Sequence, residues 1–226
     1  MRKTILIIVA VIISAMQFAT YAQVTQKQLK ERQELAKASK KELNEKVSKA
    51  ARKEAKRLEK EKWQAAPGAL PIEKQLDRSY MLQMQYDEDG FPMYVMGEGM
   101  SIGGNYDAAK MQALELAKQN LAATIQSEVV SLVKNNVVNK QLDEGKAASL
   151  AKIVNASRSR MSQSLERVIT VVEMYQVVNG NNRQVLVRLA YSQEMAKATA
   201  KKAMIEAMEA EGDELQSEID QLWGEE

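Results

Sequence analysis

Cysteine and histidine are both absent from the 226 residues. Without cysteine the chain has no disulfides, no thiolate metal sites and no lipid-modified cysteine of the kind that anchors bacterial lipoproteins. Without histidine it lacks the commonest general base and metal ligand. A hydrolase would need a carboxylate pair, such as Asp87 or Glu98 with another acid, and no pattern brings two acids together. We therefore predict no enzyme, no catalytic or metal-binding residue and no cofactor.

Long apolar runs are also missing, apart from a short one at the N-terminus. The basic start Met1-Arg2-Lys3 precedes the apolar run from Ile5 to Ala15, and a small residue, Ala22, ends the segment. This is the pattern of a secretory signal, and the run is too short for a membrane span. Residues 1–22 are predicted to be cleaved. The mature protein is then exported, periplasmic or outer-membrane-associated, with no lipid anchor and no transmembrane segment.

Proline and glycine are scarce, and residues 24–64 contain neither. This segment is rich in strong helix formers, so residues 23–64 are predicted to form one long charged helix. Its apolar stripe is thin: Leu29, Ala36, Leu43, Val47, Ala50 and Leu58. The helix therefore either lies along a partner or stands partly free in solvent. Residues 65–71, which include two prolines and a glycine, are predicted to be a linker.

Charge is balanced overall but not along the chain. Residues 27–62 carry 14 Lys or Arg against 7 Glu, whereas residues 194–226 carry 3 against 10 acidic residues. Opposite charge favours pairing of these ends within one chain or between copies. An acidic envelope surface or partner protein is an alternative, as is a simply solvated helix. Export argues against nucleic acid.

Residues 72–226 are predicted to form one α+β domain with an acidic C-terminal helix. A short segment, 72–86, has mixed helix and strand periodicity, and we favour helix. The other predicted elements are a strand at 93–100, helices at 105–138 and 146–166, a strand at 169–178, a hairpin turn at 179–182 with a return strand, and a helix at 192–223. The order predicts a small, mostly antiparallel sheet of about three strands, with the two middle helices on one face.

Two motifs have a functional and a structural interpretation. The glycine-rich segment Gly97–Gly104 before a helix is typical of anion-binding loops. It fits neither nucleotide-binding pattern, and Asp107 would repel phosphate, so we interpret the glycines as allowing close backbone approach. The acidic turn Asp87–Gly90 starts like a calcium loop with Glu98 at the twelfth position. Residues between them are not ligands, so a simple acidic turn is favoured.

Three further patterns are interpreted structurally. Ser157–Arg160 and the glycosylation sequon Asn155–Ser157 both fall inside a predicted amphipathic helix, which favours a solvated helical face. Five methionines around the first strand could bind soft metals, but flexible core filling is the commoner use. They are Met81, Met84, Met93, Met96 and Met100.

The block Phe91–Gly99, followed by a helix with regularly spaced alanines from Ala108 to Ala122, resembles the Lpp-twenty-type lipoproteins and the N-terminal domain of the flagellar assembly protein T. The hairpin Val171–Tyr191 and the next helix fit the same pattern, so the likeness covers about residues 91–200. The chain also resembles uncharacterised secreted proteins of the Bacteroides type. The resemblance implies an envelope protein with a small α/β domain and no known catalysis. The lipidated cysteine of the lipoproteins is missing here.

These observations lead to two functional hypotheses. The first is a non-enzymatic exported cell-envelope protein that acts through protein–protein contact or self-association, with other envelope proteins or itself as partner. The second is a module that binds a small ligand or an envelope polymer, at the Gly97–Gly104 loop or on the sheet face.

Overall fold

A computed structural model describes residues 48–87, 91–138, 144–178, 180–211 and 215–222. The chain divides into two units, 1–46 and 47–226, and all described residues belong to the second. The predicted signal peptide and most of the predicted charged helix lie outside the described residues. Among the described residues, no helix has the length and apolar character needed to cross a membrane.

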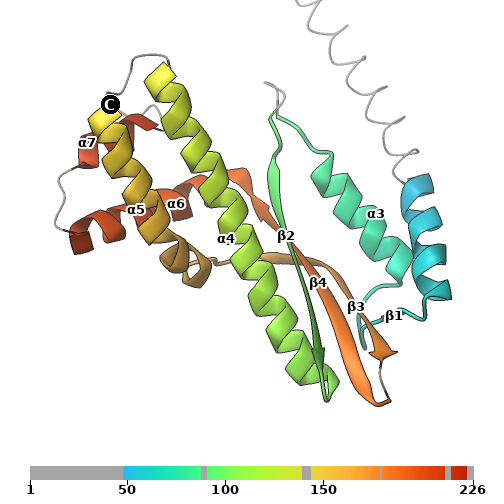
Figure 1. The fold of residues 1–226 in the computed structure, drawn as a ribbon. Helices are drawn as coiled ribbons and strands as arrows, with labels where there is room; N and C mark the ends of the chain where they lie inside the picture. The colour runs from blue at the N-terminus through green and yellow to red at the C-terminus, as the bar shows by residue number, and fades with distance from the viewer. Residues whose placement is uncertain (1–47, 88–90, 139–143, 179, 212–214, 223–226) are drawn as a thin grey trace, which may run out of the picture. The chain divides into compact units, whose positions relative to one another are not determined.

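The described fold is α+β, with one antiparallel sheet in the order β1-β3-β4-β2 (Figure 1). The strands are β1 (Gln64–Ala65), β2 (Tyr94–Gly103), β3 (Ile169–Val178) and β4 (Asn182–Ser192). β3 and β4 form the predicted hairpin. The α+β class is confirmed, and the sheet has one strand more than predicted. The extra strand, β1, has only two residues and therefore no readable alternation.

Five labelled helices and one unlabelled helix complete the described fold. They are α3 (Ile72–Gln83), α4 (Tyr106–Val138), α5 (Glu144–Gln163), α6 (Gln193–Glu211) and α7 (Gln216–Leu222), with a helical segment over 48–60 before them. The preference for helix at 72–86 is confirmed for α3. Two of these helices begin at a side-chain cap: Asn105 Oδ1 accepts from Ala108 N at 2.9 Å, and Ser192 Oγ accepts from Met195 N at 3.3 Å.

Helices cover both faces of the sheet (Figure 1). On one face, α4 packs on β2 and β4, and α5, α6 and α7 join the same core. Of the two middle helices, α4 packs directly on the sheet, whereas α5 packs on α4 and α6. On the other face, α3 and the 48–60 helix pack against β3 and β4 around Trp63, Leu76 and Val172.

The 48–60 helix differs from its sequence prediction. It packs on the sheet with Ala51, Ala55 and Leu58 buried, while Ala50 of the predicted stripe is exposed. Ser48 Oγ also donates to Asp77 Oδ1 of α3 at 2.8 Å. Its neighbours are thus α3 and the sheet, and α6 and α7 belong to the opposite core. The predicted linker at 65–71 likewise begins inside β1 and does not separate two packed parts.

Candidate functional site

The glycine-rich strand β2 packs directly against the backbone of α4. A Cβ added at Gly97 would lie 2.5 Å from the Ala117 carbonyl oxygen, and one at Gly99 would lie 2.2 Å from that of Ala113. Both distances are far below ordinary contact. The interpretation of these glycines as sites of close backbone approach is therefore confirmed, and the helix backbone fills the space that a ligand would need beside them.

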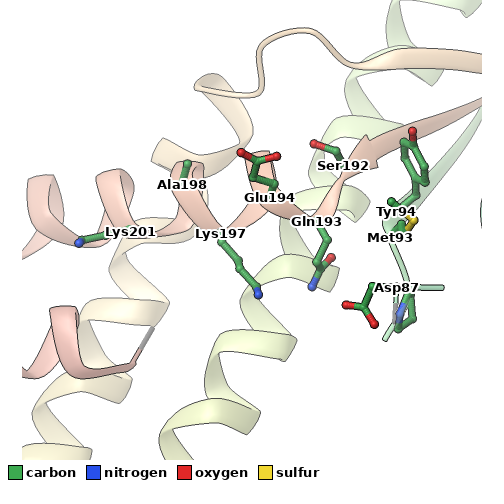
Figure 2. Close-up of a pocket in the computed structure, with 10 residues that line it drawn as sticks. Asp87, Met93, Tyr94, Ser192, Gln193, Glu194, Lys197, Ala198 and Lys201 are labelled. Carbon is green, nitrogen blue, oxygen red and sulfur yellow. The ribbon is translucent and has the colours of Figure 1, made fainter. Parts of the chain in front are cut away.

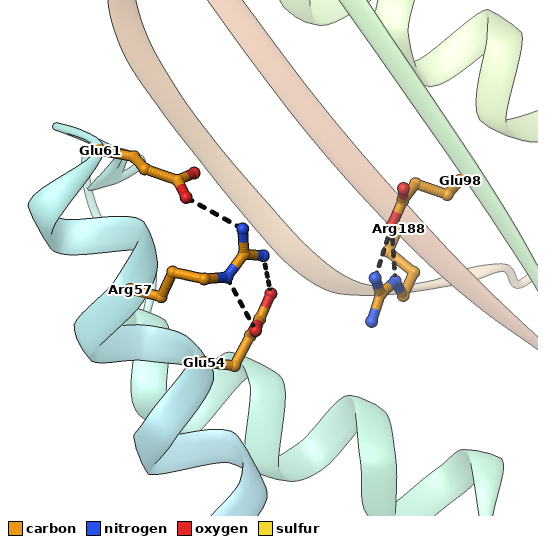
Figure 3. Close-up of polar contacts among 5 residues, drawn as sticks. All are labelled: Glu54, Arg57, Glu61, Glu98 and Arg188. Atoms are coloured by element: carbon orange, nitrogen blue, oxygen red, sulfur yellow. Dashed lines mark hydrogen bonds and ion pairs between the residues drawn. The ribbon is translucent and has the colours of Figure 1, made fainter.

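The other motifs of the sequence also have defined positions. Asp87 lies in the loop before β2, whereas Glu98 lies on β2 and is bound by Arg188 (Figure 3). The rest of the acidic turn, residues 88–90, lies outside the described residues. The part of the chain that the structure describes holds no group of three His, Cys, Asp or Glu side chains arranged to bind a metal.

Two helical motifs lie in α5, as predicted. Ser157 is buried and donates from Oγ to the Val154 carbonyl oxygen at 2.9 Å, while Arg158 and Arg160 are exposed. The methionines correct the sequence interpretation in part. Met96 packs against the second core, but Met84, Met93 and Met100 are each more than two-fifths exposed, so these three do not fill the core.

A groove runs between α4, α6 and the loop before β2. It consists of two neighbouring cavities of about 540 and 550 Å³. Both are lined by the same four residues: Asp87, Pro92, Gln193 and Lys197. We call this site the α4–α6 groove. Each cavity alone falls in the range of about 300–1,000 Å³ that is usual for ligand sites.

The α4 wall of the groove is largely apolar. Ile125, Val129 and Leu132 line it, together with three hydroxyl-bearing residues, Thr124, Ser127 and Ser131. Each hydroxyl donates to a carbonyl oxygen of α4 four residues earlier, at 2.9–3.0 Å. These donors are therefore already used within the helix. The wall suits an apolar group better than a polar one.

The lip of the groove is formed by residues 85–87 and 91–93, which are hydrogen-bonded to each other and expose large apolar side chains. Asp87 N donates to the Phe91 carbonyl oxygen at 2.9 Å, Phe91 N donates to Asp87 Oδ1 at 2.8 Å, and Met93 N donates to the Gln85 carbonyl oxygen at 2.9 Å. Tyr86 and Phe91 are nevertheless 53% and 65% exposed. These hydrogen bonds hold the backbone of the segment, and exposed aromatic side chains on a held backbone bind partners at a low entropic cost.

Gln193 joins the three walls. Its backbone N donates to the Met93 carbonyl oxygen at 2.9 Å, and its side-chain Nε2 donates to Glu128 Oε2 of α4 at 2.7 Å. Figure 2 shows that the side chains of Asp87, Gln193 and Lys197 lie around one space. Lys197 is exposed on α6 and supplies a positive charge at the junction of the two cavities.

Sequence reasoning missed most of this groove. It considered Asp87 as a catalytic acid and as part of an acidic turn, and Phe91 as part of the block that carries the resemblance. It did not single out Glu128, Gln193 or Lys197. The residues that line the groove come from three segments, 87–94, 124–132 and 192–201, which are far apart in the sequence. The one local sign was the pair of small residues Ala196 and Ala200, which lie one helical turn apart and leave room beside α6.

Comparisons with protein-family models, with curated proteins and with solved structures give no match for this chain. The resemblance to Lpp-twenty-type lipoproteins and to the flagellar assembly protein T domain thus stays a prediction.

Proposed function

We propose that this chain is a non-enzymatic, exported cell-envelope protein that acts by binding another protein in the α4–α6 groove. The observation that carries the proposal is the lip of the groove. There Phe91 lines the apolar cavity and is exposed, and Tyr86 is exposed on the segment that pairs with residues 91–93. Exposed aromatic groups next to a concave apolar surface are typical of sites that bind protein partners.

The chemistry of the groove specifies the partner segment. Ile125, Val129 and the small residues of α6 favour an apolar side chain. Lys197 favours an acidic group beside it, whereas Asp87 and Glu128, which line the same cavity, disfavour one elsewhere. We therefore propose a partner segment that pairs a large apolar residue with Asp or Glu. The exposed position of Lys197 means that its charge adds specificity more than affinity.

Site-specific photo-crosslinking in intact cells tests this proposal. A photoreactive phenylalanine analogue at Phe91 is expected to capture a defined envelope protein, and the same analogue at Met111 is the control. Met111 is 73% exposed on α4 but does not line the groove. Binding of the purified partner is then expected to weaken in Phe91→Ser and Lys197→Glu. Equal capture from both positions, or binding unchanged in both variants, would contradict the proposal.

Export is a separate part of the proposal and has its own test. Mass spectrometry of the protein isolated from cell envelopes is expected to show an N-terminus at Gln23. Retention of Met1 would contradict export by a cleaved signal. The charged segment 23–47 is proposed as an additional interaction arm. A deletion that tests the arm should stop before Ser48, because residues 48–60 pack on the sheet.

A second candidate function is the binding of a small ligand in the same groove, and the volume of each cavity favours it. Its ligand would be amphipathic, with an acidic group near Lys197 and an apolar part along α4. Native mass spectrometry of protein purified from its source tests this candidate. A bound small molecule that is lost in Lys197→Glu supports it, and a ligand-free protein contradicts it.

A further inference from the structure

β2 is a long strand at an open edge of the sheet. Among the residues that the structure describes, it lies at one end of the order β1-β3-β4-β2, and its ten residues pair with β4 on one side only. Residues 85–87 pair with residues 91–93 just before it, so the free edge begins at Tyr94. Soluble proteins usually protect such edges with charge, proline or a short length. Here Tyr94–Gly103 contains no proline and one charged residue, Glu98.

Two hydrogen bonds show which backbone groups face the open edge. Gln193 N, opposite Met93, donates to the Met93 carbonyl oxygen, so the odd-numbered residues bond towards β4. Asn120 Nδ2 of α4 donates to the Glu98 carbonyl oxygen at 2.7 Å, so the even-numbered residues face outwards. Because strand groups alternate, the N–H and C=O groups of Met96, Met100 and Ile102 also point to the free edge.

Uncharged side chains flank this edge on both sides. On the α3 face, Met100 and Ile102 are each 49% exposed. On the α4 face, one exposed row of the helix lies along the strand and carries no charge: Ala108, Gln112, Leu116 and Asn120. Its position is set by the Asn120 contact and by Ser101 Oγ, which donates to Gln112 Oε1 at 2.6 Å. This row lacks charge although 27% of the residues in the chain are charged.

The one charge on the strand is balanced within the chain. Arg188 of β4 donates to Glu98 Oε2 from two nitrogens, at 2.8 and 2.6 Å (Figure 3). Two copies of this edge can therefore approach each other without repulsion between unpaired carboxylates. The backbone groups of an open strand edge pair with another extended strand. The β2 strand of a second copy is such a strand, and it has the same uncharged side chains on both sides.

We propose that β2 pairs antiparallel with β2 of a second copy, so that two four-stranded sheets join into one across a two-fold axis. The pairing covers Met100 and Ile102 on one face and brings the uncharged α4 rows together on the other. The α4–α6 groove meets β2 at Tyr94, so the part of the interface around Met100 and Ile102 does not depend on it. The interface also differs from pairing through charged helices, because added salt does not weaken it.

Sedimentation of the mature full-length chain tests the proposal at low and high salt. We expect a dimer in both. Ile102→Pro removes an outward N–H and leaves the bonds to β4 intact, and Met100→Lys places a charge at the interface. Each is expected to weaken dimerisation by about tenfold or more. Val177→Lys is the matched control, because Val177 is a 47% exposed strand residue on β3.

Circular dichroism checks that each variant folds. If Ile102→Pro does not fold, Met100→Lys still tests the proposal. A second readout uses the absence of cysteine from the chain. A single cysteine at Met100 is expected to form an intermolecular disulfide faster than one at Val177. A monomeric wild-type chain, a dimer that salt disperses, or a dimer unchanged by both β2 variants would each overturn the proposal.

Discussion

The two faces of the sheet are covered in different ways. On the α4 face, contact is made by small residues: the glycines of β2 lie directly against Ala109, Ala113 and Ala117 of the helix. On the α3 face, a smaller apolar cluster is supplemented by buried polar links, among them Gln75 and Ser79, both at most 4% exposed. Close backbone packing tolerates no added volume, whereas hydrogen-bonded packing tolerates no lost partner. The faces should therefore respond to opposite kinds of substitution.

The largest expected effect is from adding volume on the α4 face. Gly99→Val would place a side chain 2.2 Å from the Ala113 carbonyl oxygen, and only movement of the helix backbone relieves this overlap. We expect a loss of about 3 kcal/mol or more in the free energy of unfolding, at the upper end for overpacking. Denaturant unfolding measures it. Gly104→Ala is the control, because a Cβ there meets nothing within 4 Å, and a similar loss in both variants would contradict this account.

Removing buried volume should destabilise both faces, and the two losses show how much each face contributes to the free energy of unfolding. Leu121 on the α4 face is fully buried, and Leu76 on the α3 face is 2% exposed. Replacing either with alanine should cost about 2–5 kcal/mol, with the larger loss at Leu121 because its cluster is larger. Thermal unfolding of both variants compares them. A larger loss at Leu76 would show that the α3 face dominates the stability of the fold.

A smaller effect is expected from a polar link on the α3 face. Gln75 accepts a hydrogen bond from Glu173 N at 2.6 Å and donates from Nε2 to the Leu70 carbonyl oxygen. Gln75→Ala leaves both backbone groups without this partner, at a cost of about 1–3 kcal/mol. Gln176→Ala is the comparison, because the Gln176 side chain donates to another side chain, that of Gln184, across the hairpin. Equal stability of the two variants would argue against the importance of the buried link.

The smallest expected effect concerns the ionic contact that fixes α7 in the α4-face core. Hydrogen bonds from Lys146 and Ser217 lower the pKa of Glu218, against the opposing effect of burial. A carboxyl whose pKa is lowered on folding stabilises the protein above its unfolded pKa, and this stabilisation is lost as the pH falls through the folded pKa. Glu218→Gln should therefore be less stable than the wild type near neutral pH.

The difference between Glu218→Gln and the wild type should then shrink in acid. Unfolding experiments from neutral pH down to below the ordinary glutamate pKa check this. Asp220, which lies on α7 like Glu218, is contacted by Lys201 of α6 at 2.8 Å. It offers a less buried comparison with a pKa lowered in the same direction. A pH-independent difference at Glu218 would show that its contact with Lys146 adds nothing through charge.

The sequence predicted the elements of the second unit well because their patterns are local. α4 was predicted to within a few residues, with regularly spaced alanines along it, and the β3–β4 hairpin from its turn and return strand. The position of the 48–60 helix could not be predicted, because its alanines at 51 and 55 are small and many charges surround them. Its burial is decided by α3 and β3. The groove was missed because it depends on contacts between residues far apart in the sequence, such as the hydrogen bond between Gln193 and Glu128.

The positions of β1 and β2 along the chain carry a consequence for the order of folding. β2 and α4 are consecutive and joined by two residues, Gly104 and Asn105, so their contact closes almost no loop. β1 meets β3 across a separation of 111 residues, as the Gln64–Tyr175 contact shows. Loop-closure entropy therefore favours early formation of the β2–α4 pair and late arrival of β1 with the 48–60 helix. Substitutions at Ala113 should slow folding, and those at Trp63 should mainly speed unfolding.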